Sequence, residues 1–179
     1  MIRNILTKIN NNPLFINTYP EEDEQDGNYK TPALFTNVMY CTSSNILDDH
    51  KELSNMLHTG LTMDIIPKYI PDAHVNQVTR TRLNGTVQGV YYGPHNDVRN
   101  GQPGLWTFVY YVNDADGDTV FFSDDGKTEM KRTKYKKGNG VLFPAHYWHT
   151  MDVTSVPLRV SIGMTYSIET KLNAEETTA

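Results

Sequence analysis

Two histidines and an aspartate are spaced so that they could bind one metal ion. His95 and Asp97 are separated by a single residue. Because side chains two apart on an extended backbone point to the same side, these two could share an ion. A third ligand could come from His146 or His149, which lie in a later aromatic segment. Two imidazoles and one carboxylate cover one face of an octahedral metal and leave three positions open.

This ligand set is typical of non-haem iron(II) sites. A structural zinc site would instead use four protein ligands, commonly cysteines, and the chain has a single cysteine, Cys41. Each feature also has an ordinary interpretation when taken alone. The pair His95 and Asp97 could be surface residues, and a histidine among aromatics is commonly a hydrogen-bonded core residue.

An arginine on a later strand could bind an anion. Residues 158–166 alternate between apolar and polar side chains, and the polar positions are Arg159, Ser161, Gly163 and Thr165. The alternation predicts a strand with two different faces. The polar face either meets water, as in an ordinary amphipathic strand, or lines a polar cavity. In the second case Arg159 would hold a carboxylate with two parallel hydrogen bonds.

Alternating segments and a nearly unbroken apolar run at 105–112, typical of a strand covered on both faces, predict a mainly β fold from about residue 78. The expected strands lie at 77–83, 105–112, 119–122, 127–136, 141–143 and 158–166. Clusters of turn residues, such as 113–118, separate them. Several short strands with regular turns favour a sandwich or a barrel-like jelly roll.

One amphipathic helix is predicted at 45–59, where apolar side chains fall on one face. Gly60 is expected to end it, since glycine commonly follows the last turn of a helix. Its two histidines, His50 and His58, are expected at the surface.

The length of 179 residues indicates a single domain, 1–179. Within it we expect an N-terminal supporting region at 1–77, a jelly-roll core at 78–168 that holds the site, and a polar tail at 171–179.

Composition excludes several classes of protein. Hydrophobic residues make up 38% of the chain and no apolar run approaches a membrane span, so we expect neither a disordered nor a membrane protein. The net charge of -5 gives no reason to expect a nucleic-acid partner. The single cysteine, with no signal-peptide pattern at residues 1–6, leads us to expect a cytoplasmic location.

Taken jointly, the motifs resemble the iron(II)/2-oxoglutarate-dependent dioxygenase superfamily, and most closely its prolyl 4-hydroxylase-like branch. The resemblance covers about 78–168 and includes the interval of ten residues between His149 and Arg159. Residues 108–113 are similar to the branch's Tyr-Tyr-Leu-Asn strand, and 117–122 to its Gly-Glu-Thr strand. Residues 137–144 are similar to the branch's Lys-x-Gly-x-x-Leu-x-Phe segment, which precedes the second metal-binding histidine of the family.

The resemblance implies a double-stranded β-helix, or jelly roll, that binds iron(II) and 2-oxoglutarate. The metal ligands would be His95, Asp97 and His149, because His146 would give a longer interval to the arginine than the family has. Dioxygen would be the oxidant and ascorbate a supporting reductant. The residues expected to bind 2-oxoglutarate are Arg159 and Tyr111, with Ser161 and Thr119 as weaker helpers.

The activity implied by the resemblance is hydroxylation of a C–H bond. The substrate would be a peptidyl proline, another side chain of a peptide or protein, or a small molecule. Residues expected near the mouth of the site are Arg99, Tyr91, Tyr92 and Trp148, although Trp148 also fits a core role.

Two alternatives stay open at this point. One is a jelly roll that has lost catalysis and serves a binding or structural function, without iron dependence. The other is a cupin-type metal enzyme that does not use 2-oxoglutarate, which would tolerate loss of Arg159.

Overall fold

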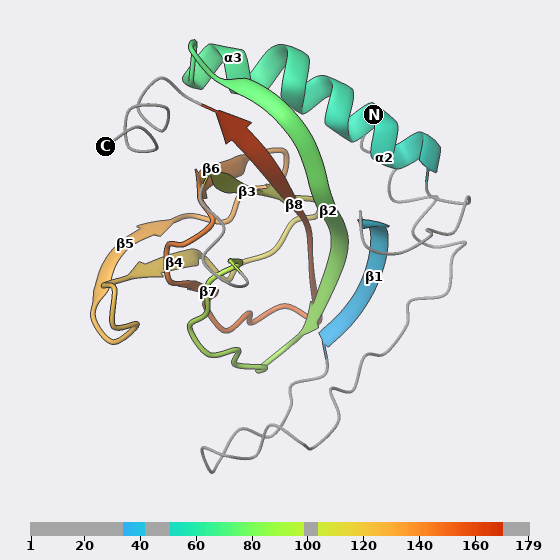
Figure 1. Cartoon of the computed structure of the whole chain (residues 1–179). Helices are drawn as coiled ribbons and strands as arrows, with labels where there is room; N and C mark the ends of the chain where they lie inside the picture. The colour runs from blue at the N-terminus through green and yellow to red at the C-terminus, as the bar shows by residue number, and fades with distance from the viewer. Residues whose placement is uncertain (1–33, 42–50, 99–103, 170–179) are drawn as a thin grey trace.

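Antiparallel strands form most of the molecule, as the alternating sequence predicts (Figure 1). The structure is a computed structural model and describes residues 34–41, 51–98 and 104–169. Its strands are β1 (Leu34–Cys41), β2 (His74–Val87), β3 (Leu105–Tyr111), β4 (Thr119–Phe122), β5 (Glu129–Thr133), β6 (Gly140–Pro144), β7 (His149–Met151) and β8 (Leu158–Glu169).

The strands form two sheets, with the orders β1-β2-β8-β3-β6 and β5-β4-β7. All of the strand pairs are antiparallel. This arrangement confirms the expected mainly β, double-stranded β-helix fold. The three-residue strand β7 was not predicted, because it is too short to show a period.

Both faces of β8, the central strand of the larger sheet, are buried. Val160, Ile162 and Met164 pack into the hydrophobic core on one face. On the other face Arg159 and Ser161 are each only 3% exposed. The polar face therefore does not meet bulk water, and it turns toward a cavity instead.

A helical segment covers the outer side of β2 and β8 (Figure 1). It consists of α2 (Lys51–Gly60), the π-helical η3 (Leu61–Ile65) and α3 (Ile66–Tyr69). Leu57, Leu61 and Ile66 join the core that the apolar face of β8 forms. Burying each such side chain contributes about 1.5–3 kcal/mol, so the helices hold the long strands that carry the site.

The prediction that Gly60 ends the helix is wrong. Gly60 has φ -60° and ψ -39°, which is right-handed helical backbone, and the chain continues directly into η3. A glycine terminates a helix when it takes the left-handed conformation, and here the apolar side chains that follow keep the segment helical. The predicted helix start at residues 45–50 lies outside the described residues.

The prediction that His58 lies at the surface is also wrong. Its Nδ1 is 3.0 Å from the Tyr166 hydroxyl, and its Nε2 is 2.9 Å from the Thr81 hydroxyl. Burial lowers the pKa of His58 to about 4, so the ring is neutral at pH 7. His58 thus connects α2 to β8 and β2. The matching prediction for His50 lies outside the described residues.

Other expectations about the chain ends stay open. The tail predicted at 171–179 lies outside the described residues, and the single-domain organisation stays a prediction. Within the described residues, no helix has the length and apolar character needed to cross a membrane.

Candidate metal centre

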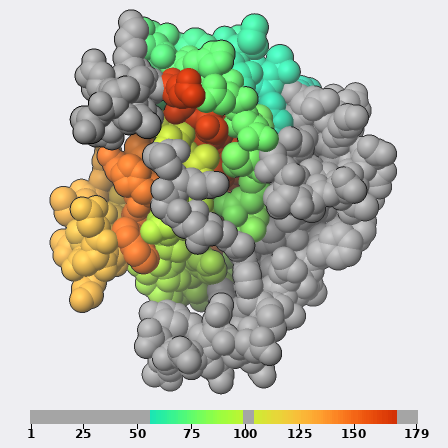
Figure 2. Space-filling view, in the orientation of Figure 1, coloured from blue at the N-terminus to red at the C-terminus, as the bar shows by residue number. Residues whose placement is uncertain are grey.

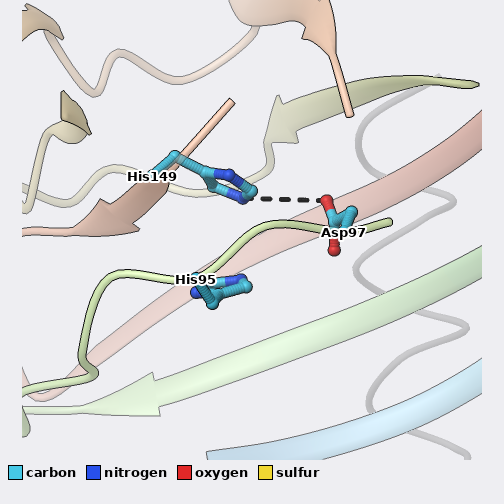
Figure 3. Close-up of side chains that lie close together, drawn as sticks. All are labelled: His95, Asp97 and His149. Carbon is cyan, nitrogen blue, oxygen red and sulfur yellow. Dashed lines mark ion pairs between the residues drawn. The ribbon is translucent and has the colours of Figure 1, made fainter. Parts of the chain in front are cut away.

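The side chains of His95, Asp97 and His149 point toward one another (Figure 3). Each offers one ligand atom, and these atoms all lie within 4.8 Å of one another. The Nε2 atom of His149 is 3.7 Å from the Oδ2 atom of Asp97. The predicted triad is therefore confirmed. His146, the alternative third ligand, is exposed and is not part of the cluster.

Backbone pairing brings the two histidines together although they are far apart in the chain. His95 and His149 form an isolated antiparallel bridge, with N–H···O distances of 2.9 and 2.8 Å. The Asp97 N–H donates to the Ala145 carbonyl at 2.9 Å. His149 begins β7 at the edge of the smaller sheet, and Ala145 directly follows β6, so the ends of these two strands fix the three ligands.

The hydrogen bonds of the imidazoles leave one nitrogen of each ring available to a metal. The Nδ1 atom of His149 is 2.9 Å from the Tyr147 carbonyl, and that of His95 is 3.3 Å from the Gly93 carbonyl. Since a carbonyl only accepts, Nδ1 carries the proton in both rings. Each Nε2 is thus the nitrogen that can bind a metal, which is the usual arrangement of metal-binding histidines.

Burial keeps the His95 ring neutral, which is the form that binds a metal. Burial, followed by the neighbouring His149, lowers the pKa of His95 to about 4, although Asp97 acts in the opposite direction. The Tyr92 ring packs edge-on against His95, with 4.9 Å between the ring centroids.

Two residues that sequence reasoning missed hold the carboxylate of Asp97. An Arg80 guanidinium nitrogen is 2.9 Å from Oδ1, and the Thr107 hydroxyl donates to Oδ2 at 2.8 Å. Burial alone would raise the pKa of Asp97, but His149, Arg80 and Thr107 together lower it. Asp97 is therefore a charged ligand whose orientation is set from both sides. The alternation of residues 77–83 was the only sequence signal for Arg80.

The triad faces a pocket that lies between the two sheets. Its lining includes the whole polar face of β8 from Arg159 to Thr165, together with alternate residues of β2 and side chains of β3, β4 and β7. The polar face of residues 158–166 therefore lines a polar cavity and does not face water, which was the second of the two interpretations of this segment.

Arg159 is a buried cation at one end of this pocket. Its Nε donates to the Gly117 carbonyl at 3.0 Å, and Nη1 lies 3.3 Å from the Ser161 hydroxyl. The guanidinium carbon is 4.6 Å from the centroid of the Tyr135 ring. No carboxylate among the described residues lies within ion-pair distance of Arg159.

A buried guanidinium without a carboxylate partner is costly, so this end of the pocket is suited to an anion. Burial lowers the pKa of Arg159, and Tyr135, Tyr111 and Asp118 oppose that change. Arginine stays protonated throughout the range in which proteins are folded.

Gly117 is required for the position of Arg159. Its φ of +88° lies in the left-handed region, where a side chain causes strain. A Cβ atom there would lie 2.8 Å from the Asp152 carbonyl oxygen and 3.2 Å from Cδ of Arg159. Only glycine lets the backbone approach the arginine this closely.

Tyr111 lies deeper than the other residues expected to bind 2-oxoglutarate. It is fully buried, and its hydroxyl is 2.8 Å from the hydroxyl of Thr119. Thr119 and Ser161 belong to the described pocket lining, whereas Tyr111 does not. Direct binding of 2-oxoglutarate by Tyr111 stays a prediction, and Thr119 is the group that reaches the pocket.

The residues predicted near the mouth of the site have different positions. Tyr92 lines the pocket beside His95, and Tyr91 is 52% exposed. Trp148 is outside the described lining, and a Cβ atom on Gly126 would lie 3.1 Å from its ring. Trp148 is half-buried and lies close to the β4–β5 turn, and its role at the mouth stays a prediction. Arg99 lies outside the described residues.

Two antiparallel sheets, a triad of two histidines and one aspartate, and a buried arginine in the same pocket define a non-haem iron oxygenase of the double-stranded β-helix class. A sequence profile of the 2OG-Fe(II) oxygenase superfamily matches residues 77–166. The chain belongs to this family. No curated protein sequence matches the chain.

Solved structures share the fold at low sequence identity. A 2OG-Fe(II) oxygenase family oxidoreductase from Burkholderia pseudomallei has a TM-score of 0.62 and 15% identity, covering 75% of this chain and 68% of its own. A prolyl-4-hydroxylase from Pseudomonas putida has a TM-score of 0.55 and 14% identity, covering 93% and 85%. A prolyl hydroxylase from Trichoplax adhaerens, in complex with a hypoxia inducible factor oxygen degradation domain peptide fragment, has a TM-score of 0.58 and 14% identity, covering 99% and 80%.

The residues present fit the two groups that the family uses. Two imidazoles and one carboxylate suit iron(II) and leave coordination positions open. Arg159, which has no carboxylate partner in the part of the chain that the structure describes, suits a carboxylate of 2-oxoglutarate. These fits confirm the cofactors that the sequence resemblance implied, and they count against a non-catalytic jelly roll.

Proposed function

We propose that the protein hydroxylates a C–H bond of a prolyl residue in a peptide. The observation that carries this proposal is the single pocket that joins the metal triad to Arg159. In this family iron(II) supplies the chemistry by which 2-oxoglutarate, dioxygen and a substrate C–H bond become succinate, carbon dioxide and a C–OH group.

The protein's own contribution at the metal is to hold three ligands in place. The carbonyls of Gly93 and Tyr147 fix the two imidazole rings, and Arg80 and Thr107 fix the carboxylate of Asp97. Such hydrogen bonds around a metal site commonly change metal affinity or activity by about 10–100-fold. We expect loss of Arg80 or Thr107 to have effects of this size.

At the other end of the pocket, Arg159 would bind the carboxylate of 2-oxoglutarate that lies farther from the metal. The Ser161 and Thr119 hydroxyls line the same part of the pocket and can donate to that carboxylate. The Tyr135 ring, against which the guanidinium packs, and the Gly117 carbonyl keep Arg159 oriented. The cupin-type alternative, in which 2-oxoglutarate is not used, gives no role to the buried guanidinium of Arg159.

Support for a prolyl substrate comes from the motifs and from the fold. The strand and turn motifs of the chain resemble the prolyl 4-hydroxylase-like branch, and two solved prolyl hydroxylases share its fold. Tyr92 lines the pocket next to His95 and offers an aromatic surface for a pyrrolidine ring.

The test uses short proline-containing peptides and the same peptides with proline replaced by alanine. Protein is incubated with iron(II), 2-oxoglutarate, ascorbate and air, and both succinate and peptide mass are measured. We expect a proline peptide to gain the mass of one oxygen atom in proportion to the succinate released. Succinate release that no proline peptide stimulates, together with unmodified peptides, would contradict the prolyl assignment.

A further inference from the structure

A methionine lies at the Arg159 end of the pocket. Met151 is the last residue of β7, two positions after His149, and both residues line the pocket. Side chains two apart on a strand point to the same side, so Met151 follows the metal ligand along one face of β7. Of the methionines that the structure describes, Met151 is the one that belongs to the pocket lining.

The thioether of Met151 reaches from the smaller sheet to the larger one. Its sulfur accepts a hydrogen bond from the Thr86 hydroxyl at 3.2 Å, and Nη1 of Arg159 lies 3.7 Å from the same sulfur. Thr86 and Arg159 are direct partners on β2 and β8, whereas Met151 pairs with Thr119 of β4. The sulfur is therefore beside two hydrogen-bond donors, at the place where Arg159 would bind 2-oxoglutarate.

The hydrogen bond between Arg159 and the sulfur is one that a carboxylate can replace. A thioether sulfur is only a weak acceptor, whereas an ionised carboxylate forms strong hydrogen bonds with a guanidinium. The other acceptor of Nη1 is the Ser161 hydroxyl at 3.3 Å. Because both acceptors are uncharged, 2-oxoglutarate can displace the sulfur from Arg159.

Oxidation would turn this weak acceptor into a strong one. A thioether takes one oxygen atom from hydrogen peroxide: a sulfur lone pair forms the S–O bond, and the O–O bond breaks. The hydroxide that leaves takes the proton of the transferred oxygen and becomes water, so the sulfur loses two electrons and the peroxide gains them. The product, methionine sulfoxide, is polar. Its oxygen would lie within hydrogen-bond distance of Arg159 or Thr86, because the sulfur already contacts both.

The positions of the other methionines make Met151 the one whose oxidation reaches Arg159. Met151 is half-buried, so a small oxidant can reach its sulfur through the empty pocket. Met63 and Met130 are 72% and 68% exposed and lie outside the pocket lining, and Met164 is only 1% exposed in the core. Oxidation of the exposed methionines therefore leaves the surroundings of Arg159 unchanged.

We propose that Met151 is a redox-sensitive modification site that controls the binding of 2-oxoglutarate. Peroxide converts Met151 to its sulfoxide, and the sulfoxide oxygen accepts hydrogen bonds from Arg159 and Thr86 in competition with the cosubstrate. Bound 2-oxoglutarate in turn shields the sulfur. This inference rests on the proposed role of Arg159 in binding 2-oxoglutarate and is independent of the identity of the main substrate.

The test measures the mass of the peptide that contains Met151 and the dissociation constant of 2-oxoglutarate. Metal-free protein is treated with hydrogen peroxide, which catalase then removes. Zinc(II), which has no redox chemistry, replaces iron(II), and 2-oxoglutarate binding is measured by calorimetry. We expect the peptide to gain the mass of one oxygen atom and 2-oxoglutarate to bind at least about tenfold more weakly. Adding zinc(II) and 2-oxoglutarate before the peroxide should prevent both changes.

Three variants locate the effect. Met151→Leu cannot form a sulfoxide, so its dissociation constant should be the same before and after peroxide. Met151→Gln carries an amide oxygen close to where the sulfoxide oxygen would be, and it should bind 2-oxoglutarate weakly without any peroxide. Met130→Leu is the matched control, because Met130 lies on β5, in the lobe at the left of Figure 2. Peroxide should weaken binding in this control as much as in the natural sequence.

Any of four results would overturn the proposal. These are no oxidation of Met151, unchanged binding once Met151 is oxidised, an equal loss after peroxide in Met151→Leu, and binding by Met151→Gln as tight as in the natural sequence.

Untreated protein separates this inference from the proposed role of Arg159. Arg159→Gln should bind 2-oxoglutarate weakly. Arg132→Gln should not, because Arg132 pairs with Glu129 and Asp152 and lies outside the pocket lining. Tight binding by Arg159→Gln would reject both the cosubstrate assignment and this inference. Weak binding by Arg159→Gln, with no effect of the Met151 sulfoxide, would reject this inference alone.

Discussion

Arg159 has the clearest role of any single side chain outside the triad. Its guanidinium is buried and lies at the end of the pocket away from Asp97, where Thr86 is its partner across the sheet. Sequence reasoning identified the residue but left open whether it faced water. That question depends on which face of β8 the helices cover, and the alternation alone does not determine it.

Replacing Arg159 should weaken the binding of 2-oxoglutarate. In Arg159→Gln we expect the half-saturating concentration of 2-oxoglutarate to rise at least about tenfold, because a charge-assisted pair in a sheltered site contributes several kcal/mol. The measurement is succinate release against 2-oxoglutarate concentration, with Arg132→Gln as the control. An unchanged half-saturating concentration would show that Arg159 does not contact the cosubstrate.

Replacing Gly117 should also raise the half-saturating concentration of 2-oxoglutarate, because it disturbs the position of Arg159. Gly117→Ala places a methyl group against Arg159 and strains a left-handed backbone, whereas Gly138→Ala strains a similar backbone with nothing within 4 Å. Both variants should unfold a few degrees lower, since such strain costs about 1–3 kcal/mol. Only Gly117→Ala should also require more 2-oxoglutarate. Equal requirements in the two variants would mean that Arg159 does not depend on this glycine.

At the scale of elements, the sequence predicted the positions of the strands more accurately than the pairing between strands or the end of the helix. Period-two alternation identified β2 and β8, because each has one face toward the core and one toward the pocket, and a continuous apolar run identified β3. It could not give the register between β2 and β8, which places Arg80 and Arg82 beside the polar face of β8. Thr107 was missed for the same reason, since its role depends on strand pairing.

The helix shows a second limit of sequence reasoning. His58 was expected at the surface because it is polar, yet it bonds to both Tyr166 and Thr81. The face that a helix buries depends on the strands against which it packs, and the two partners of His58 lie 23 and 108 positions later in the chain.

The burial of His58 should make stability depend on pH. Its pKa is about 4 in the folded protein and about 6.5 in an unfolded chain. Between these values the unfolded chain binds more protons, so the folded state loses stability as pH falls from about 6.5 toward 4.

Thermal unfolding measured from pH 7 to pH 4.5 tests this expectation. The decrease in unfolding temperature should be smaller in His58→Gln than in the natural sequence. His74→Gln, at the exposed start of β2, serves as the control and should keep the full decrease. The same decrease in all three proteins would show that His58 titrates normally.

At the scale of the whole molecule, the two sheets enclose one pocket with a metal triad and a buried cation, and the helices cover the opposite face of the larger sheet. Residue types and spacing were enough to predict the triad, because the ligands of a metal must be specific residue types. The residues that orient the ligands could not be found in this way. Arg80 and Thr107 are common residue types, and only the folded arrangement brings them to Asp97.

The central claim is that His95, Asp97 and His149 bind iron(II) for turnover of 2-oxoglutarate. The most direct measurement is iron-dependent succinate release and iron(II) binding in His149→Ala, compared with His146→Ala, whose histidine is exposed and only three positions away. We expect His149→Ala to lose iron-dependent turnover and to bind iron(II) much more weakly, while His146→Ala keeps both. Full activity in His149→Ala, or equal loss in both variants, would contradict the account.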